Sequence, residues 1–130
     1  MVVAAHPDDE VLGCGGTIAR EVSLGNEVFV LILGDGETSR GTEGIEEKLK
    51  QKSSSAQASG EVLGVKAVFS ESFPDNSFDK VALLEIVKTV ERYLAAINPC
   101  VVFTHHHSDL NIDHQLTFQA VLTACRPLED

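Results

Sequence analysis

The 130-residue sequence has few of the features that mark membrane, disulfide-rich or nucleic-acid-binding proteins. It has no tryptophan and one tyrosine, and it lacks a run of about 18 apolar residues, the length a helix needs to cross a bilayer. Ten basic residues stand against 20 acidic ones, for a formal net charge of −10. Such a charge argues against binding to a nucleic-acid backbone and against adhesion to anionic lipid. We therefore expect no nucleic-acid partner and no membrane attachment.

Cysteine is also scarce, and its spacing argues against a disulfide framework or a cysteine-rich zinc site. Cys14, Cys100 and Cys125 are odd in number, lie far apart and form no CxxC pair. We expect three small, buried or half-buried residues in a reducing compartment. The first residues lack a basic segment followed by a long apolar stretch, so the sequence predicts a cytoplasmic protein. A homo-oligomer is compatible with it.

The hydrophobic content of 43% is enough for a real core, and the length favours one domain over residues 1–130. Short apolar runs predict buried strands, and apolar residues at helical spacing predict helices between them. Their alternation predicts an α/β fold, a Rossmann-like three-layer α/β/α sandwich with a mainly parallel sheet. The strands are expected at residues 2–5, 28–33, 65–69 and 100–104, and the helices at residues 10–24, 45–63, about 83–97, and a last one with Phe118, Val121, Leu122 and Cys125 on its buried face.

Particular residues predict where the helices begin and end. Gly25 and Gly64 are expected to stop the first two helices, and Asp79 to cap the third. Glycines 13, 15 and 16 lie in the first turns of the first helix, where they are costly unless the backbone closely approaches the sheet or a substrate. Their spacing does not match the G-x-G-x-x-G of a dinucleotide-binding loop.

The chain's most informative stretch follows the first strand: His6-Pro7-Asp8-Asp9-Glu10. Residues at the carboxyl end of a parallel strand project where open α/β folds place their sites. His6 and Asp9 could supply two ligands to a zinc-type metal, and Asp8 could act on the water that the metal activates. Pro7 stiffens the turn between them.

A second group of polar residues follows the fourth predicted strand. His105, His106 and His107 leave that strand, and alternation in an extended segment would put the first and third on one side. Four residues before Phe118, His114 falls on the inward face of the last helix. His6, Asp9 and His114 would then be three protein ligands with one open position, as in a catalytic zinc site.

Read together with Asp109-Leu110-Asn111-Ile112-Asp113-His114, the first motif resembles the PIG-L/LmbE-like family of zinc-dependent N-deacetylases over residues 2–125. The resemblance implies Zn²⁺, or another divalent metal, and hydrolysis of an N-acetyl group from a small N-acetylated amino sugar or sugar conjugate, with Asp8 as general base. Relatives often have a histidine that steadies the oxyanion where this chain has Asn111, and an arginine where it has Lys52. They are generally longer, so the fold is expected to be truncated at its C-terminal end.

Other residues have predicted roles around this centre. Asp113 is expected to be a partner of a metal ligand or a helix cap, and Glu10 to act only as a cap for the helix dipole. The basicity of Asp8 would depend on partial burial. The substrate contacts are expected from the glycine-rich loop 34–41 and the histidine run, namely Asp35, Arg40, His105 and His107.

Three alternatives remain open. The chain could be a metal-dependent hydrolase of another bond, either a thiol-conjugate amide or a phosphoester. It could instead be a non-catalytic domain that binds a sugar or nucleotide, with a decayed metal site. Finally, the acids that follow His6 could merely complement a helix dipole.

Overall fold

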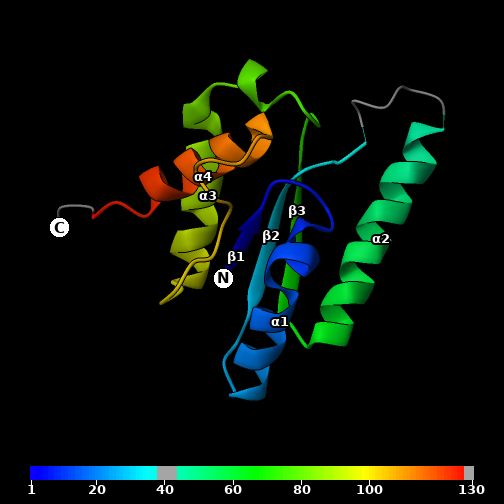
Figure 1. Cartoon of the computed structure of the whole chain (residues 1–130), viewed down its shortest axis with the longest axis vertical. Helices are drawn as coiled ribbons and strands as arrows, with labels where there is room; N and C mark the ends of the chain where they lie inside the picture. The colour runs from blue at the N-terminus through cyan, green and yellow to red at the C-terminus, as the bar shows by residue number, and fades with distance from the viewer. Residues whose placement is uncertain (38–43, 128–130) are drawn as a thin grey trace.

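The computed structural model describes residues 1–37 and 44–127. Helices and strands alternate from β1 to β3, as the sequence predicts, and helices follow after β3 (Figure 1). The second long helix has the predicted bounds. The elements are β1 (Val2–Ala4), α1 (Asp9–Ser23), β2 (Phe29–Gly34), α2 (Ile45–Leu63), β3 (Ala67–Phe73), the short 3-10 helix η2 (Phe78–Lys80), α3 (Leu83–Ile97) and α4 (Ile112–Ala124).

The three strands form a parallel sheet in the order β1-β2-β3. On the free side of β1, Val2 forms a parallel bridge with Phe103, so the chain returns after α3 to the far edge of the first strand. The direction in which strands are added therefore reverses at β1. Open α/β sheets bind ligands at such a switch point, outside the carboxyl ends of the strands. The predicted Rossmann-like α/β fold is confirmed.

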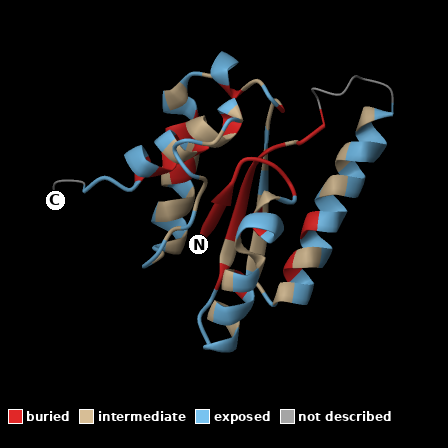
Figure 2. Ribbon diagram, in the orientation of Figure 1, coloured by how far each residue is buried: buried red, intermediate tan, exposed pale blue. Residues whose placement is uncertain are grey.

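Helices cover both faces of the sheet, which gives three layers (Figure 1). In β2, Val30 and Ile32 belong to the core cluster that includes residues of α1 and α2, whereas Leu31 and Leu33 belong to the cluster that includes residues of α3 and α4. This alternation follows from the two-residue period of a strand. β1 and β2 are buried along nearly their whole length, as Figure 2 shows, and because both faces are covered their residues are apolar throughout.

The third and fourth strands differ from their predictions. β3 pairs with β2 as far as Phe73, four residues beyond the predicted end. Residues 100–104 run beside β1 but are not a buried strand, since Val101 is 56% and Phe103 37% exposed. Within the described residues, the backbone of this segment pairs only with the β1 side. The apolar run correctly predicts that residues 100–104 are extended. Burial of this segment would also require a neighbouring element on the side that faces away from β1.

The start of α3 and the buried face of α4 also differ from their predictions. Gly25 and Gly64 do end α1 and α2 with left-handed backbones. Asp79 lies within η2 and does not cap α3, which begins after Ala82 without a side-chain cap. On α4 the buried face is shifted from the predicted one, because Leu122 and Cys125 are exposed and Phe118 is half-buried. The residues that α4 buries are Asp113, Thr117, Ala120, Val121 and Ala124.

All three cysteines are free, as expected, but only Cys14 is half-buried, and Cys100 and Cys125 are exposed. In the described part of the chain, no helix is long and apolar enough to span a membrane.

Substitution by alanine is expected to change the free energy of unfolding in opposite directions at Gly34 and Gly13. A Cβ at Gly34 would lie 2.9 Å from the Ala5 carbonyl oxygen and 3.0 Å from the Phe78 ring, whereas a Cβ at Gly13 or Gly16 would meet no described atom within 4 Å. The described residues therefore show no close approach to the sheet at Gly13 or Gly16, and a close approach to a substrate stays a prediction. Gly34→Ala should lower the free energy of unfolding by about 1–3 kcal/mol through overpacking. Gly13→Ala, the matched control, should raise it by about 0.5–1 kcal/mol. Urea unfolding measures both, and equal stabilities would contradict this packing.

Candidate metal centre

Two segments more than 100 residues apart meet at the switch point. The turn after β1 brings His6 and Asp9, and the first turn of α4 brings His114. The Nδ1 atom of His6 lies 3.4 Å from Nε2 of His114 and 3.5 Å from Oδ2 of Asp9, and the latter two atoms are 3.2 Å apart. The side chains are 11–18% exposed, so the cluster is largely buried but reachable from solvent.

These separations match those of ligands around one zinc ion. Bonds of about 2.0–2.1 Å at tetrahedral angles place ligand atoms about 3.3–3.4 Å apart. Among the described residues, two other groups of side chains offer ligand atoms close together. In one, Nε2 of His6 lies 2.8 Å from a carboxylate oxygen of Asp113, which is a hydrogen bond and too short for two ligands of one ion. In the other, the His105 and His114 rings stack 3.9 Å apart, so their nitrogens do not converge in their ring planes. The group of His6, Asp9 and His114 fits a metal best.

In each of the two histidines, the outer ring nitrogen, which is the one that faces away from the candidate metal position, is hydrogen-bonded to a carboxylate. Asp113, with no exposed surface, accepts from Nε2 of His6 at 2.8 Å and from the Phe78 backbone N–H at 3.0 Å. Asp109 accepts from Nδ1 of His114 at 3.0 Å. Because a carboxylate only accepts, each outer nitrogen carries the proton, and the inner nitrogen has a free lone pair whenever its imidazole is neutral. Carboxylates typically orient metal-ligating histidines in this way.

Asp113 has one of its two expected roles and Asn111 has the other. Asp113 is a partner of a candidate metal ligand, but that ligand is His6 and not His114, and Asp113 is not the helix cap. Asn111 caps α4, because its Oδ1 accepts from the backbone N–H of Asp113 at 2.8 Å. Its Nδ2 donates to Asn76 at 3.1 Å. The predicted oxyanion role of Asn111 stays a prediction, and it would use the second hydrogen of that amide.

Without a metal, His6 makes stability depend on pH. Burial lowers the pKa of His6, but hydrogen bonds to Asp113 and Asp9 outweigh it and raise the pKa from 6.5 to about 9. The stability that this charge contributes is complete below pH 6.5 and is lost as the pH rises to about 9. Urea unfolding of chelator-treated protein should therefore show a falling contribution in this interval. The control is His6→Gln, which lacks the titrating ring, and equal pH slopes in the two proteins would contradict the assignment.

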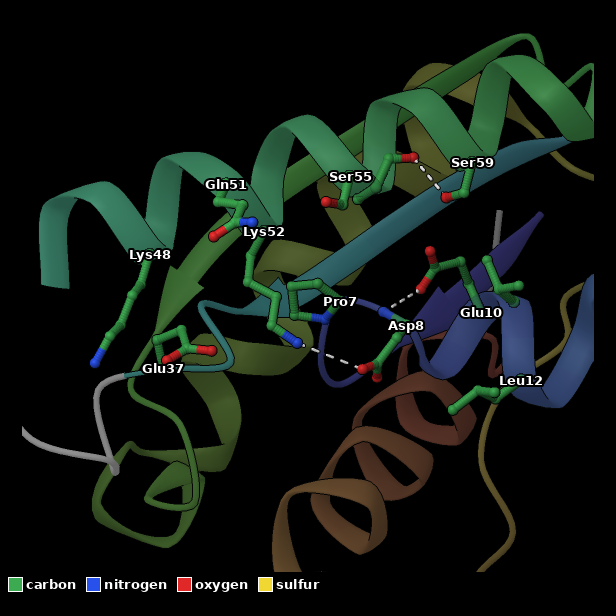
Figure 3. A pocket seen from close by; sticks show the side chains of 12 residues that line it. Pro7, Asp8, Glu10, Leu12, Glu37, Lys48, Gln51, Lys52, Ser55 and Ser59 are labelled. Carbon is green, nitrogen blue, oxygen red and sulfur yellow. Dashed lines mark hydrogen bonds and ion pairs between the residues drawn. The ribbon is translucent and has the colours of Figure 1, made fainter. Parts of the chain in front are cut away.

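Asp8 directly precedes Asp9 in the chain, and its carboxylate lies toward the ammonium group of Lys52, as Figure 3 shows. Its side chain is 59% exposed, so the predicted partial burial is wrong. Its backbone φ of 100° is left-handed, a conformation that costs free energy for aspartate and often occurs at functional sites. The buried Glu10 stabilises this turn by accepting from the Asp8 backbone N–H at 3.0 Å, as its capping role predicts, and burial raises the pKa of Glu10.

Asp8 lines a groove of about 690 Å³ between the start of α1 and the length of α2 (Figure 3). Nζ of Lys52 lies 3.5 Å from Oδ2 of Asp8. The groove is lined by Pro7, Asp8, Glu10, Val11, Leu12, Glu37, Lys48, Gln51, Lys52, Ser55, Ala56 and Ser59.

The structure brings only some of the predicted substrate residues to the site. His105 stacks on His114, and its Nε2 accepts from the Ala5 backbone N–H at 2.8 Å. His107 is exposed and contacts Ser108 and Phe118 instead, because the chain turns after His105 and the predicted alternation ends. Asp35 accepts from the backbone N–H of Glu37 at 3.0 Å. Arg40 lies outside the described residues.

Sequence reasoning missed Asp75, which is buried and lies 3.2 Å from Nε2 of His6. Its position just after a strand could have identified Asp75 as a candidate site residue, but the third strand was predicted to end at residue 69. With the true end at Phe73, Asp75 follows two residues after the carboxyl end of β3, at the same edge as His6.

The fold and this cluster define a Rossmann-like α/β protein with a candidate metal centre at its switch point. The sequence pattern of the PIG-L family, described as GlcNAc-PI de-N-acetylase, matches residues 1–125. The chain belongs to this family of deacetylases, and the resemblance found in the sequence is confirmed.

Two of the individual relatives are named as deacetylases, and a third is a hydratase. The chain is 28% identical to the uncharacterized deacetylase YaiS of Escherichia coli, over 98% of this chain and 68% of YaiS. It is similar to N,N'-diacetylchitobiose deacetylase of Pyrococcus horikoshii, with 25% identity, a TM-score of 0.83, and 95% of this chain and 47% of that one covered. It also resembles GalB, the 4-carboxy-2-hydroxymuconate hydratase of Pseudomonas putida, with 26% identity, a TM-score of 0.76, and 95% and 53% covered. The chain thus spans about half the length of these solved structures.

Proposed function

We propose that this protein is a zinc-dependent N-deacetylase that removes the acetyl group from an N-acetylated amino sugar or sugar conjugate. The observation that carries the proposal is the triangle of ligand atoms from His6, Asp9 and His114, with edges of 3.2–3.5 Å, next to Asp8. Membership of the PIG-L family supports the reaction class.

In this proposal His6, Asp9 and His114 hold the zinc ion. When bound, zinc polarises the amide carbonyl and lowers the pKa of water toward about 7. Asp8 takes the proton from the attacking water and passes it to the leaving nitrogen, which departs as a free amine while acetate forms. The exposure of Asp8 leaves its carboxylate free to reach a substrate in the groove.

Asp8 rather than the histidine run is proposed to carry the proton through both stages. Nε2 of His105 accepts a hydrogen bond from the Ala5 backbone N–H, so this nitrogen has no proton to donate and the neutral ring carries its proton on Nδ1. Burial also lowers the pKa of His105 to about 4, which keeps the ring neutral at neutral pH. His105 is therefore proposed to support the ring of His114 by stacking and not to act as the acid.

The groove beside Asp8 is the proposed place for the sugar. Gln51, Ser55 and Ser59 project from one face of α2 and can hydrogen-bond hydroxyl groups, while Leu12 faces them from α1 (Figure 3). Lys52 approaches Asp8 with a single ammonium group, so it cannot make the two-pronged contact of an arginine.

The experiment is to follow acetate and free amine released by zinc-loaded protein from N-acetylglucosamine conjugates, with phosphate release from aryl phosphates as the competing assay. We expect acetate and amine in equal amounts and no phosphate, because Lys48 and Lys52 are outnumbered at the groove by Asp8, Glu10 and Glu37. Phosphate release, or zinc-loaded protein that yields no acetate from any such conjugate, would contradict the proposal.

A further inference from the structure

The His6 imidazole is held by a second buried carboxylate besides Asp113. Oδ1 of Asp75 lies 3.2 Å from Nε2 of His6, and Oδ2 of Asp113 lies 2.8 Å from the same nitrogen. Asp75 is 5% exposed and Asp113 is fully buried. When its hydrogen is at Nε2, the neutral imidazole has one hydrogen to donate; the hydrogen bond goes to Asp113, and the carboxylate of Asp75 lies close beside the same N–H group.

The segment that carries Asp75 is fastened to the first turn of α4. Asn76 accepts from the side chain of Asn111 at 3.1 Å, and the backbone N–H of Phe78 donates to Asp113 at 3.0 Å. The turn after β3 and the start of α4 are therefore bonded to each other, and each carries one carboxylate that contacts Nε2 of His6. Two buried carboxylates beside one N–H group are costly unless positive charge balances them.

We propose that Asp75 is a positioning residue for His6, which shares the Nε2 proton with Asp113, keeps the Nδ1 lone pair directed at the metal position and balances the charge of a bound dication. This inference rests on the proposed metal centre. Partners of this kind change metal affinity about 10–100-fold when they are removed.

The test is the dissociation constant of zinc, measured by competition with a chromogenic chelator, for the parent and Asp75→Asn. We expect Asp75→Asn to bind zinc about tenfold more weakly. In zinc-loaded protein, NMR should show faster solvent exchange of the His6 Nε2 proton, a readout that a purely structural role of Asp75 would not change.

Asp79→Asn is the matched control, because it makes the same change of carboxylate to amide. Asp79 is exposed within η2 and belongs to none of the groups of candidate metal ligands. The zinc affinity of this variant should stay within about twofold of the parent. If the parent binds zinc and Asp75→Asn binds it equally well, with unchanged exchange of the Nε2 proton, the role of Asp75 is overturned while the proposed function stands. A parent chain that binds no zinc would overturn both.

Discussion

Asp8→Asn is expected to lower the rate of acetate release by about 10²–10⁴-fold and to leave the zinc content unchanged. Asparagine cannot accept the proton of water, but it has the same shape and tolerates the left-handed backbone at this position. Asp8 supplies none of the three ligand atoms that surround the proposed metal position. Turnover with an N-acetylglucosamine conjugate and metal analysis of the same samples measure the two effects.

Asp79→Asn is the matched control for the loss of one carboxylate. Asp79 is exposed within η2 and belongs to neither the groove nor the metal cluster. Its rate should remain that of the parent. A loss of less than about threefold in Asp8→Asn would be far smaller than general-base catalysis requires. Such a result would exclude Asp8 as the general base.

Asp113→Asn is expected to weaken zinc binding by about 10–100-fold although the two side chains have the same size. The asparagine Oδ1 can still accept from the Phe78 N–H, which leaves its NH₂ group facing Nε2 of His6. Only the longer contact to Asp75 then favours a proton on Nε2, whereas the amide group favours the tautomer with the proton on Nδ1, the nitrogen that faces Asp9 and His114. The wrong tautomer blocks the metal position. Zinc competition titration measures the loss.

Asp113→Ala separates the tautomer effect from a loss of structure. It leaves the buried N–H of Phe78 without its acceptor, and it should lower the free energy of unfolding by about 1–3 kcal/mol. Asp113→Asn keeps that hydrogen bond and loses the negative charge beside His6, so in metal-free samples it should unfold closer to the parent's midpoint than Asp113→Ala does. Zinc affinity of Asp113→Asn equal to that of the parent would show that the His6 tautomer is not controlled from this side.

Local sequence patterns were sufficient for most of the fold. The helical repeat of α3 and the continuous apolar run of β2 depend on nearest neighbours in the chain, and both elements lie where these patterns predict. Burial of residues 100–104 could not be predicted in this way. It depends on what pairs with the outer side of the segment, and Val101 and Phe103 are exposed in the described structure.

The convergence of His6, Asp9 and His114 was predictable because carboxyl ends of parallel strands share one edge. Which aspartate supports which histidine was not. Adjacent helical residues point about 100° apart, so Asp113 turns into the core toward His6 while His114 faces the rim and Asp109. Asp75 was missed because a strand boundary was four residues short. The extent of the domain, the cytoplasmic location and a homo-oligomer stay predictions.

The most direct test of the metal centre is the zinc content of purified protein for the parent, Asp8→Asn and His114→Ala. With three ligand atoms converging on one position, the parent and Asp8→Asn should each hold about one zinc ion per chain, and His114→Ala should lose most of it. Equal zinc content in all three proteins would contradict the assignment of His6, Asp9 and His114 as the ligands.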